Sequence, residues 1–400
     1  MNRSKDKRPE NITDLRQLRK ERSRRRARKR LGIFLVILAA GWIIFSGVQG
    51  FFRGNYIQRI NSFLAMYLPG DGYPIEVAGA DVLDLQNAEG DLAVVGQNRV
   101  VYYNPNGRTV EEIRHNFYNV EAVCHRAQTL LYDAGGNDLT VYSGSDPVFE
   151  QSFERTIYCA DLSGGGALAV GTRSDTHTSM VTVYNSAFEE IYEWYSARGY
   201  VLDLCLPASG NRMAAATLDV SDGRLVSTVN LFDFTNAEEV KRVELADELV
   251  IDMTIMGVDN TLYVLTDRAL HEISMSAGTE LNSYSFADQG LGAYRFDDGI
   301  ITLAIGDYVG QRSLTIMRFT EGLADAPSAV CSDHLIDIRS DRSHTYLLTD
   351  NQLEVYDSSM QLLTVIETPD ASAIELIGDD VYYLTGVSLE KIAHANRVAE

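Results

Sequence analysis

Residues 201–217 read VLDLCLPASGNRMAAAT, which is an apolar run, a short turn and a second apolar run. The first run is Val201–Leu204, Ala208–Asn211 form the turn, and the second run is Met213–Thr217. Residues 157–172 repeat this order around a Gly-Gly-Gly turn. Short apolar runs separated by Gly, Asn or Ser are typical of paired β-strands. Both stretches therefore predict the same β-hairpin.

The same unit recurs along the chain from residue 73 onward, where no convincing helix is found. A third strand, often ending in Tyr-Asn or Tyr-Asp, and a more polar fourth strand complete each unit. The pairs Asn106-Gly107, Asp222-Gly223 and Asp298-Gly299 are typical of hairpin turns that need positive φ. The predicted first strands begin near Val82, Val120, Ile157, Tyr200, Leu249, Leu291, Leu335 and Ile374. A four-stranded repeat of about 40–45 residues is typical of a β-propeller blade.

Seven of these units are complete, and the eighth begins at Ile374 with room for about three strands. Pro74–Val77 forms an extra strand ahead of the first unit, and we expect it to complete the last blade. Closure of the ring would remove exposed sheet edges. The fold class is therefore all-β, an eight-bladed propeller over residues 72–395. Seven blades are the second choice, and a pair of β-sandwiches is the wider alternative.

A second feature is the run LGIFLVILAAGWIIFSGVQGFF at residues 31–52, which has no charge between Arg30 and Arg53. This length is sufficient for one transmembrane helix. Residues 1–30 carry a net charge of +10, and the remaining residues carry −31. Basic residues next to a first hydrophobic helix stay in the cytoplasm. We therefore expect an uncleaved signal anchor with a cytoplasmic N-terminus and an extracytoplasmic propeller. A cleaved signal peptide is the alternative.

The charges also restrict the partners. We expect the basic cluster to contact anionic lipid headgroups rather than nucleic acid, because it adjoins the predicted helix and contains no aromatic residue. The residues of this cluster are Arg24, Arg25, Arg26, Arg28, Lys29 and Arg30. The acidic remainder of the chain disfavours broad binding of polyanions. Residues 53–71 predict a juxtamembrane helix and linker, as a dimerising stalk or as a helix on the membrane surface.

No catalytic motif is found, since the chain has no G-x-S-x-G, no H-E-x-x-H and no phosphate-binding loop. We expect the four cysteines to be free thiols, although one bridge, such as Cys124 to Cys159, stays open. The nearest match to a zinc site is Cys331 and His334 with His344, which is too few ligands for a closed site. Only Trp42 and Trp194 are present, which disfavours a quinoprotein. We expect no cofactor.

One polar position recurs in the predicted first strands, which would line the central channel. An acidic residue flanked by apolar residues occurs there at Asp84, Asp161, Asp203, Asp252, Asp337 and Glu375. Six carboxylates at one height would form a ring that suits a cation or a basic group. Alternatively, each carboxylate accepts hydrogen bonds from backbone N–H groups of the neighbouring blade, since buried carboxylates need such partners. We prefer the second interpretation, because an uncompensated buried ring would be costly.

Three stretches of the chain resemble a known family. They are Tyr73–Val77, Thr156–Asp161 and Glu193–Ala197 leading into Gly199-Tyr200. The resemblance is to uncharacterised bacterial proteins with one N-terminal membrane helix and a propeller-like domain of unknown function, and it covers nearly all of residues 55–395. The resemblance implies a bacterial cell-envelope protein of Gram-positive type, and it offers no catalytic residues.

These observations favour a non-enzymatic, membrane-anchored propeller that holds an envelope or membrane protein. Propellers present many loops on a rigid frame, which suits binding. A sensor of a small ligand or cation, acting through the channel acids, is the first alternative. A hydrolase or lyase of envelope glycans is the second, and it would need paired carboxylates at working distance.

Overall fold

The computed structural model describes residues 70–393, except 78, 126, 236–240, 258–260, 298, 308–312, 321, 324 and 325. The predicted tail 1–30, membrane helix 31–52 and most of the juxtamembrane segment 53–71 lie outside the described residues. No helix in the described part of the chain is long and apolar enough to cross a membrane. The one helical element there is η1 (Gly79–Asp81), a single 3₁₀ turn.

Thirty-two strands of the described residues form eight antiparallel sheets of four strands each. Blade 1 contains β2 (Val82–Ala88), β3 (Asp91–Gly96), β4 (Arg99–Tyr103) and β5 (Thr109–Arg114). Blade 2 contains β6 (Val120–Cys124), β7 (Thr129–Asp133), β8 (Asp138–Ser143) and β9 (Asp146–Ser152). Blade 3 contains β10 (Ile157–Leu162), β11 (Leu168–Arg173), β12 (Ser179–Tyr184) and β13 (Glu190–Ser196). Blade 4 contains β14 (Tyr200–Cys205), β15 (Arg212–Ser221), β16 (Arg224–Asp233) and β17 (Lys241–Ala246).

The second half of the ring follows the same order. Blade 5 contains β18 (Val250–Met256), β19 (Thr261–Thr266), β20 (Ala269–Ser274) and β21 (Thr279–Ser285). Blade 6 contains β22 (Gly290–Asp297), β23 (Ile300–Gly306), β24 (Leu314–Phe319) and β25 (Ser328–Cys331). Blade 7 contains β26 (Leu335–Ser340), β27 (His344–Thr349), β28 (Gln352–Asp357) and β29 (Leu362–Glu367). Blade 8 contains β30 (Ala373–Ile377), β31 (Asp380–Leu384), β32 (Ser388–Ile392) and β1 (Ile75–Glu76).

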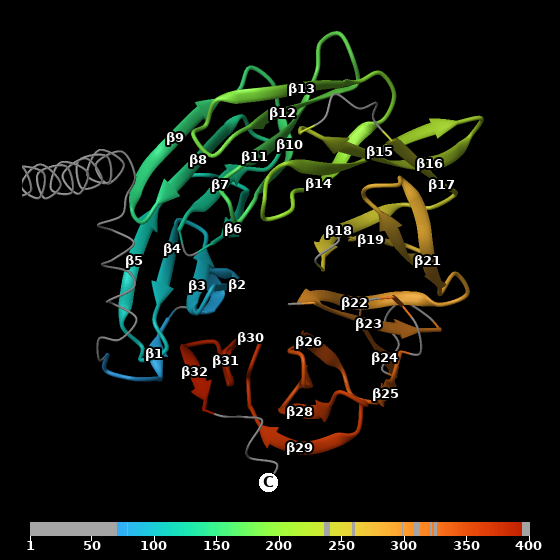
Figure 1. Cartoon of the computed structure of the whole chain (residues 1–400). Coiled ribbons are helices and arrows are strands. Elements are labelled where there is room, and N and C mark those ends of the chain that lie inside the picture. Colours follow the sequence, from blue (N-terminus) through green and yellow to red (C-terminus); the bar gives the residue numbers. More distant parts are fainter. Residues whose placement is uncertain are drawn as a thin grey trace, which may run out of the picture. The chain divides into compact units, whose positions relative to one another are not determined.

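The first strand of each blade lies on the inner side of the ring, and the fourth lies on the outer side (Figure 1). Every predicted first strand begins within one residue of the observed one. The prediction for Pro74–Val77 is also confirmed, because β1 pairs with β32 and completes blade 8 from the opposite end of the propeller sequence. The structure therefore has the eight blades that the repeat predicts.

The core lies between the blades rather than along one central axis. Eight apolar clusters are found in the described residues, and each joins two consecutive blades. Leu85 and Leu92 of blade 1 pack against Tyr382 and Leu389 of blade 8, which closes the ring. Burial of one such leucine stabilises the fold by about 1.5–3 kcal/mol. Each blade therefore contributes one face to the apolar core on either side of it.

β-Bulges occur at two repeated places in the blades. In β2, β14, β18 and β26 one extra residue stands directly before an aspartate: Leu83, Leu202, Ile251 and Ile336. Outer strands β5, β9, β13, β21 and β29 also carry one extra residue: Val110, Val148, Ile191, Leu281 and Leu363. Bulges bend and twist an edge strand away from pairing partners. The outer bulges explain why several exposed aliphatic side chains lie on the rim.

Candidate functional site

The six predicted acids all lie on inner strands, but they do not share one level. Asp84, Asp203, Asp252 and Asp337 each follow a bulge directly. In β10 the extra residue is Tyr158, so Cys159 occupies the equivalent position and Asp161 stands two residues further on. The six acids therefore do not stand at one height, as a single ring of carboxylates would require. The same bulge occurs in both kinds of strand, so the difference lies in the sequence: the acid of β10 comes two residues later, on the same face of the strand.

Glu375 stands at the same level as Asp161, which we call the second level. Its Oε2 accepts a bond of 3.2 Å from Nε of Arg339, and Arg339 stands two residues beyond Asp337 on β26. Side chains two residues apart on a strand point to the same face. The second level thus holds Asp161, Arg339 and Glu375, a mixture of charges rather than a ring of one sign.

Backbone N–H groups are the main partners of these acids. Most of the carboxylates accept the N–H of the next residue, as Asp203 does from Leu204 at 2.8 Å. Two of them also accept an N–H from the next blade: Asp161 from Leu206 at 2.7 Å and Asp337 from Ile374 at 3.0 Å. The interpretation of interblade hydrogen bonding is therefore confirmed for these two. Asp84 reaches blade 2 through Gln86, which bonds both Ala122 and Cys124.

Asp161, Asp203 and Asp252, from blades 3 to 5, form what we call the acid segment. Burial raises the pKa of Asp161 to about 6. The pKa of Asp203 is raised well above its usual range by burial and then by the charges of Asp252 and Asp161. Oδ2 of Asp203 is buried and has no hydrogen-bond partner among the described residues. The carboxyl groups on this side of the ring therefore have pKa values above the ordinary aspartate range.

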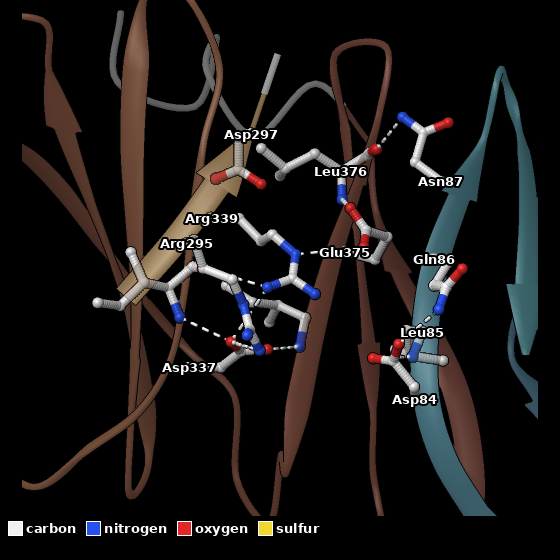
Figure 2. A network of polar contacts seen from close by, with 12 residues as sticks. Asp84, Leu85, Gln86, Asn87, Arg295, Asp297, Asp337, Arg339, Glu375 and Leu376 are labelled. Carbon is white, nitrogen blue, oxygen red and sulfur yellow. Dashed lines mark hydrogen bonds and ion pairs between the residues drawn. The ribbon is translucent and has the colours of Figure 1, made fainter. Parts of the chain in front are cut away.

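Arg295 and Arg339, with Asp297, Asp337 and Glu375, form what we call the arginine segment of blades 6 to 8. Figure 2 shows the Arg339 guanidinium between Asp337 and Glu375. Arg295 Nη2 donates to the same Asp337 oxygen at 2.9 Å. The side chains of Arg339 and Asp337 are each only 7% exposed. Charges this deeply buried must be paired, and here two guanidinium groups share one carboxylate.

The pKa values of two acids in the arginine segment are nevertheless raised. Burial raises the pKa of Asp297 to about 6 and that of Glu375 to about 7, although Arg339 opposes both shifts. Asp297 also accepts the backbone N–H of Ser340, in blade 7, at 2.6 Å. It therefore makes the interblade contact that was expected only of the six predicted acids.

A cavity of about 880 Å³ opens beside the arginine segment. It is lined by inner-strand residues and by the turns that follow these strands in blades 1, 7 and 8, including Asp84, Arg295, Asp297, Arg339 and Glu375. A volume in this range suits a small ligand. Sequence reasoning placed Asp84 and Glu375 on this wall but missed Arg295, Asp297 and Arg339. Their signal was present, because residues two positions beyond an inner-facing position must face the same side.

The cysteines and the suggested zinc ligands all lie among the described residues. All four cysteines are free, as expected, and burial raises the pKa of Cys124 to about 12. The suggested zinc ligands are not brought together: His334 pairs with Asp350, whereas His344 pairs with Asp341. No group of three or more candidate metal ligands occurs among the described residues.

Comparison with protein families gives one match. Residues 75–309 match DUF5711, a family of unknown function. The chain belongs to the DUF5711 family. The expected resemblance to a family of unknown function is thus confirmed, whereas the bacterial source and the membrane helix that it implied remain predictions. The match covers β1 to β23, so Arg339 and Glu375 of this DUF5711 propeller lie beyond it. No curated protein matches the chain.

Solved structures share the fold of this DUF5711 protein at low identity. BamB from Moraxella catarrhalis is 11% identical, with a TM-score of 0.53 over 81% of this chain and 100% of its own. The computationally designed protein Ika8 is 12% identical, with a TM-score of 0.52 over 80% of this chain and 98% of its own. A eukaryotic initiation factor is 12% identical, with a TM-score of 0.54 over 79% and 84% of the two chains. Likeness at this identity shows the fold alone.

Proposed function

We propose that this DUF5711 protein is a plasma-membrane-anchored, extracytoplasmic propeller that binds a protein partner and catalyses no reaction. The anchor is the apolar run 31–52, and the basic tail stays in the cytoplasm. The partner is an envelope or membrane protein. A closed ring with an apolar core between every pair of blades provides a rigid frame for such binding.

The observation that carries the binding role is the outer edge of blade 7. Strand β29 exposes Leu362, Leu363 and Val365 at 53%, 41% and 45%, and its one charged residue is Glu367 at the end. Outer strands β5 and β17 carry charges within the strand, whereas β25, which is also uncharged, has only four residues. Beyond the bulge at Leu363, the regular part of this β29 edge, Thr364–Glu367, has no charge before Glu367, and such an edge can pair with an extended segment of another protein. We therefore expect the partner to add a strand of low charge to β29.

The test is capture of the partner from native membranes after brief crosslinking of the full-length protein and gentle solubilisation. Residues 1–71 alone serve as the control without the propeller. We expect a stoichiometric protein partner that Val365→Lys reduces by about tenfold, since a charge at this edge blocks pairing. The matched variant Leu281→Lys, on the already charged strand β21, should keep the partner. Absence of a partner above the control, or equal capture by both variants, would overturn the proposal.

The anchor has its own test. We expect the full-length protein to stay in the membrane fraction after alkaline extraction, because an uncleaved helix spans the bilayer. A mature protein that begins after residue 52 and leaves the membrane would contradict the anchor but not the β29 interaction.

A second candidate function is ligand sensing through the inner cavity. The cavity beside the arginine segment supports it, because its walls combine charged groups of both signs in a volume that fits a small ligand. The glycan hydrolase hypothesis has less support. Asp297 is bonded to the backbone of Ser340, and Glu375 to Arg339 and the backbone of Leu376, so neither carboxyl group stands ready as an acid or a nucleophile.

A further inference from the structure

Some N–H donors of the two guanidinium groups at the cavity make no hydrogen bond with the described residues. In the described part of the chain, Arg295 donates only through Nη2, to Asp337, and its buried Nε has no hydrogen-bond acceptor. Arg339 uses Nε and Nη1 on Glu375, Asp337 and the carbonyl of Ile338. The Arg295 side chain is 42% exposed, whereas that of Arg339 is 7% exposed. A ligand can therefore reach Arg295, whereas Arg339 is buried and bonds the same carboxylate, that of Asp337.

The geometry of a guanidinium group selects the kind of ligand atom. Its planar fork of N–H donors matches the two oxygens of a carboxylate or a phosphate. Here, however, the same walls carry Asp84, Asp297, Glu375, Glu89 and Asp379. A ligand of high negative charge would be repelled by these groups. A ligand that carries one carboxylate and also a cationic group satisfies both sets of wall residues.

The rim of the cavity is held in place by another arginine. Arg318, only 2% exposed, donates to the carbonyls of Asp341, Arg342 and His344 and to the hydroxyl of Thr345. These bonds run from β24 of blade 6 to the turn between β26 and β27 of blade 7 and to the first two residues of β27. Since Asp341–His344 line the cavity, Arg318 fixes the shape of its wall.

We infer that this cavity binds a short peptide, with its C-terminal carboxylate on Arg295 and its amino end toward the acidic turns at Glu89 and Asp379. The inference rests on the second candidate function, ligand sensing through the cavity. A volume of about 880 Å³ exceeds what a single amino acid would fill, and it lies near the top of the range for small-ligand sites. The peptide enters as a zwitterion, which matches the mixed charge of the walls.

The test is equilibrium dialysis of the full-length protein in detergent against a pool of random tripeptides with free carboxyl ends. A matching pool carries C-terminal amides, and mass spectrometry measures retention of both. We expect about tenfold greater retention of the free acids, since hydrogen bonds between charged groups are worth roughly that factor or more. Arg295→Gln should remove this preference and leave the fold intact, because Asp337 keeps Arg339 and two backbone N–H partners. The exposed Arg224→Gln is the matched control.

The outcomes separate the inference from the function on which it rests. Equal retention of acids and amides would overturn the carboxylate contact and leave ligand sensing standing. Competition by excess inorganic phosphate as strong as that by the free acids would show a general anion site and overturn the zwitterionic class. Retention of neither pool would overturn the inference of a peptide ligand, whereas the sensing function would stand for other classes of small ligand. Thermal melting of each variant confirms that a loss of retention is not a loss of fold.

Discussion

The acid segment and the arginine segment both lie on inner strands, but their carboxylates have different hydrogen-bond partners. Asp203 in the acid segment accepts the backbone N–H that follows it through Oδ1, whereas its buried Oδ2 has no hydrogen-bond partner among the described residues. Asp337 in the arginine segment bonds two N–H groups and two arginines. A repeated position in a propeller thus sets where a carboxylate stands. Its chemistry depends on the residues at the next inward-facing positions, on its own strand and on the neighbouring inner strand.

The largest expected effect comes from breaking the arginine segment. Arg339→Met should reduce the free energy of unfolding by about 3–5 kcal/mol, because it leaves buried carboxylates without their cation. Equilibrium denaturation of the full-length protein measures this change. Adding Glu375→Gln should recover part of the loss, and the exposed Arg224→Met should change stability by less than about 0.5 kcal/mol. Equal losses for Arg339→Met and Arg224→Met would show that the buried pairs do not support the fold.

The acid segment should respond in the opposite direction. Asp203→Asn keeps an oxygen to accept the N–H of Leu204 and removes a charge that burial and two neighbouring acids disfavour. We expect a higher melting temperature at pH 8 and a difference that shrinks as the pH falls and the aspartate becomes protonated. The exposed turn variant Asp222→Asn is the control. A lower melting temperature for Asp203→Asn at pH 8 would contradict the assignment of Asp203 as an uncompensated acid.

The wild-type protein should show a matching pH dependence. Burial raises the folded-state pKa values of Asp161 and Asp297 to about 6 and that of Glu375 to about 7, above their unfolded values near 4. The folded state therefore holds these protons more tightly, and their stabilising contribution is lost as the pH rises from about 4 through 7. Urea midpoints across this range test the prediction, and Glu375→Gln should flatten the upper part of the curve. A midpoint that increases steadily from pH 5 to 8 would contradict it.

The smallest effect expected is that of divalent cations on the acid segment. Among the described residues no three candidate ligands stand close enough to hold a metal ion. We therefore expect calcium or magnesium to leave the melting temperature nearly unchanged, in the wild type and in a variant with Asn at Asp161, Asp203 and Asp252. A rise in the wild type that this variant lacks would restore the cation site and sharpen the contrast between the two segments.

The strand pattern of the sequence predicts the fold in detail, because each blade repeats one alternation of apolar runs and turns. The starts of the inner strands, the eight blades and the closing role of Ile75-Glu76 all follow from it. The levels of the inner acids do not, since they become visible only once the bulges are located: counted from the bulge at Tyr158, Asp161 lies two residues beyond the position that Asp203 takes after the bulge at Leu202. The pairing of Arg339 with Glu375 cannot be predicted from the pattern of acidic residues either, because the two partners lie in different blades and 36 residues apart.

Titration of individual carboxyl groups by ¹³C NMR, in full-length protein labelled at its aspartate side chains, tests the contrast between the two segments most directly. We expect the Asp203 signal to titrate above the ordinary aspartate range near 4, and to move toward that range when Asp252→Asn removes its neighbouring charge. An Asp203 signal that titrates in the ordinary range, and that Asp252→Asn leaves unchanged, would contradict the contrast between the acid segment and the arginine segment.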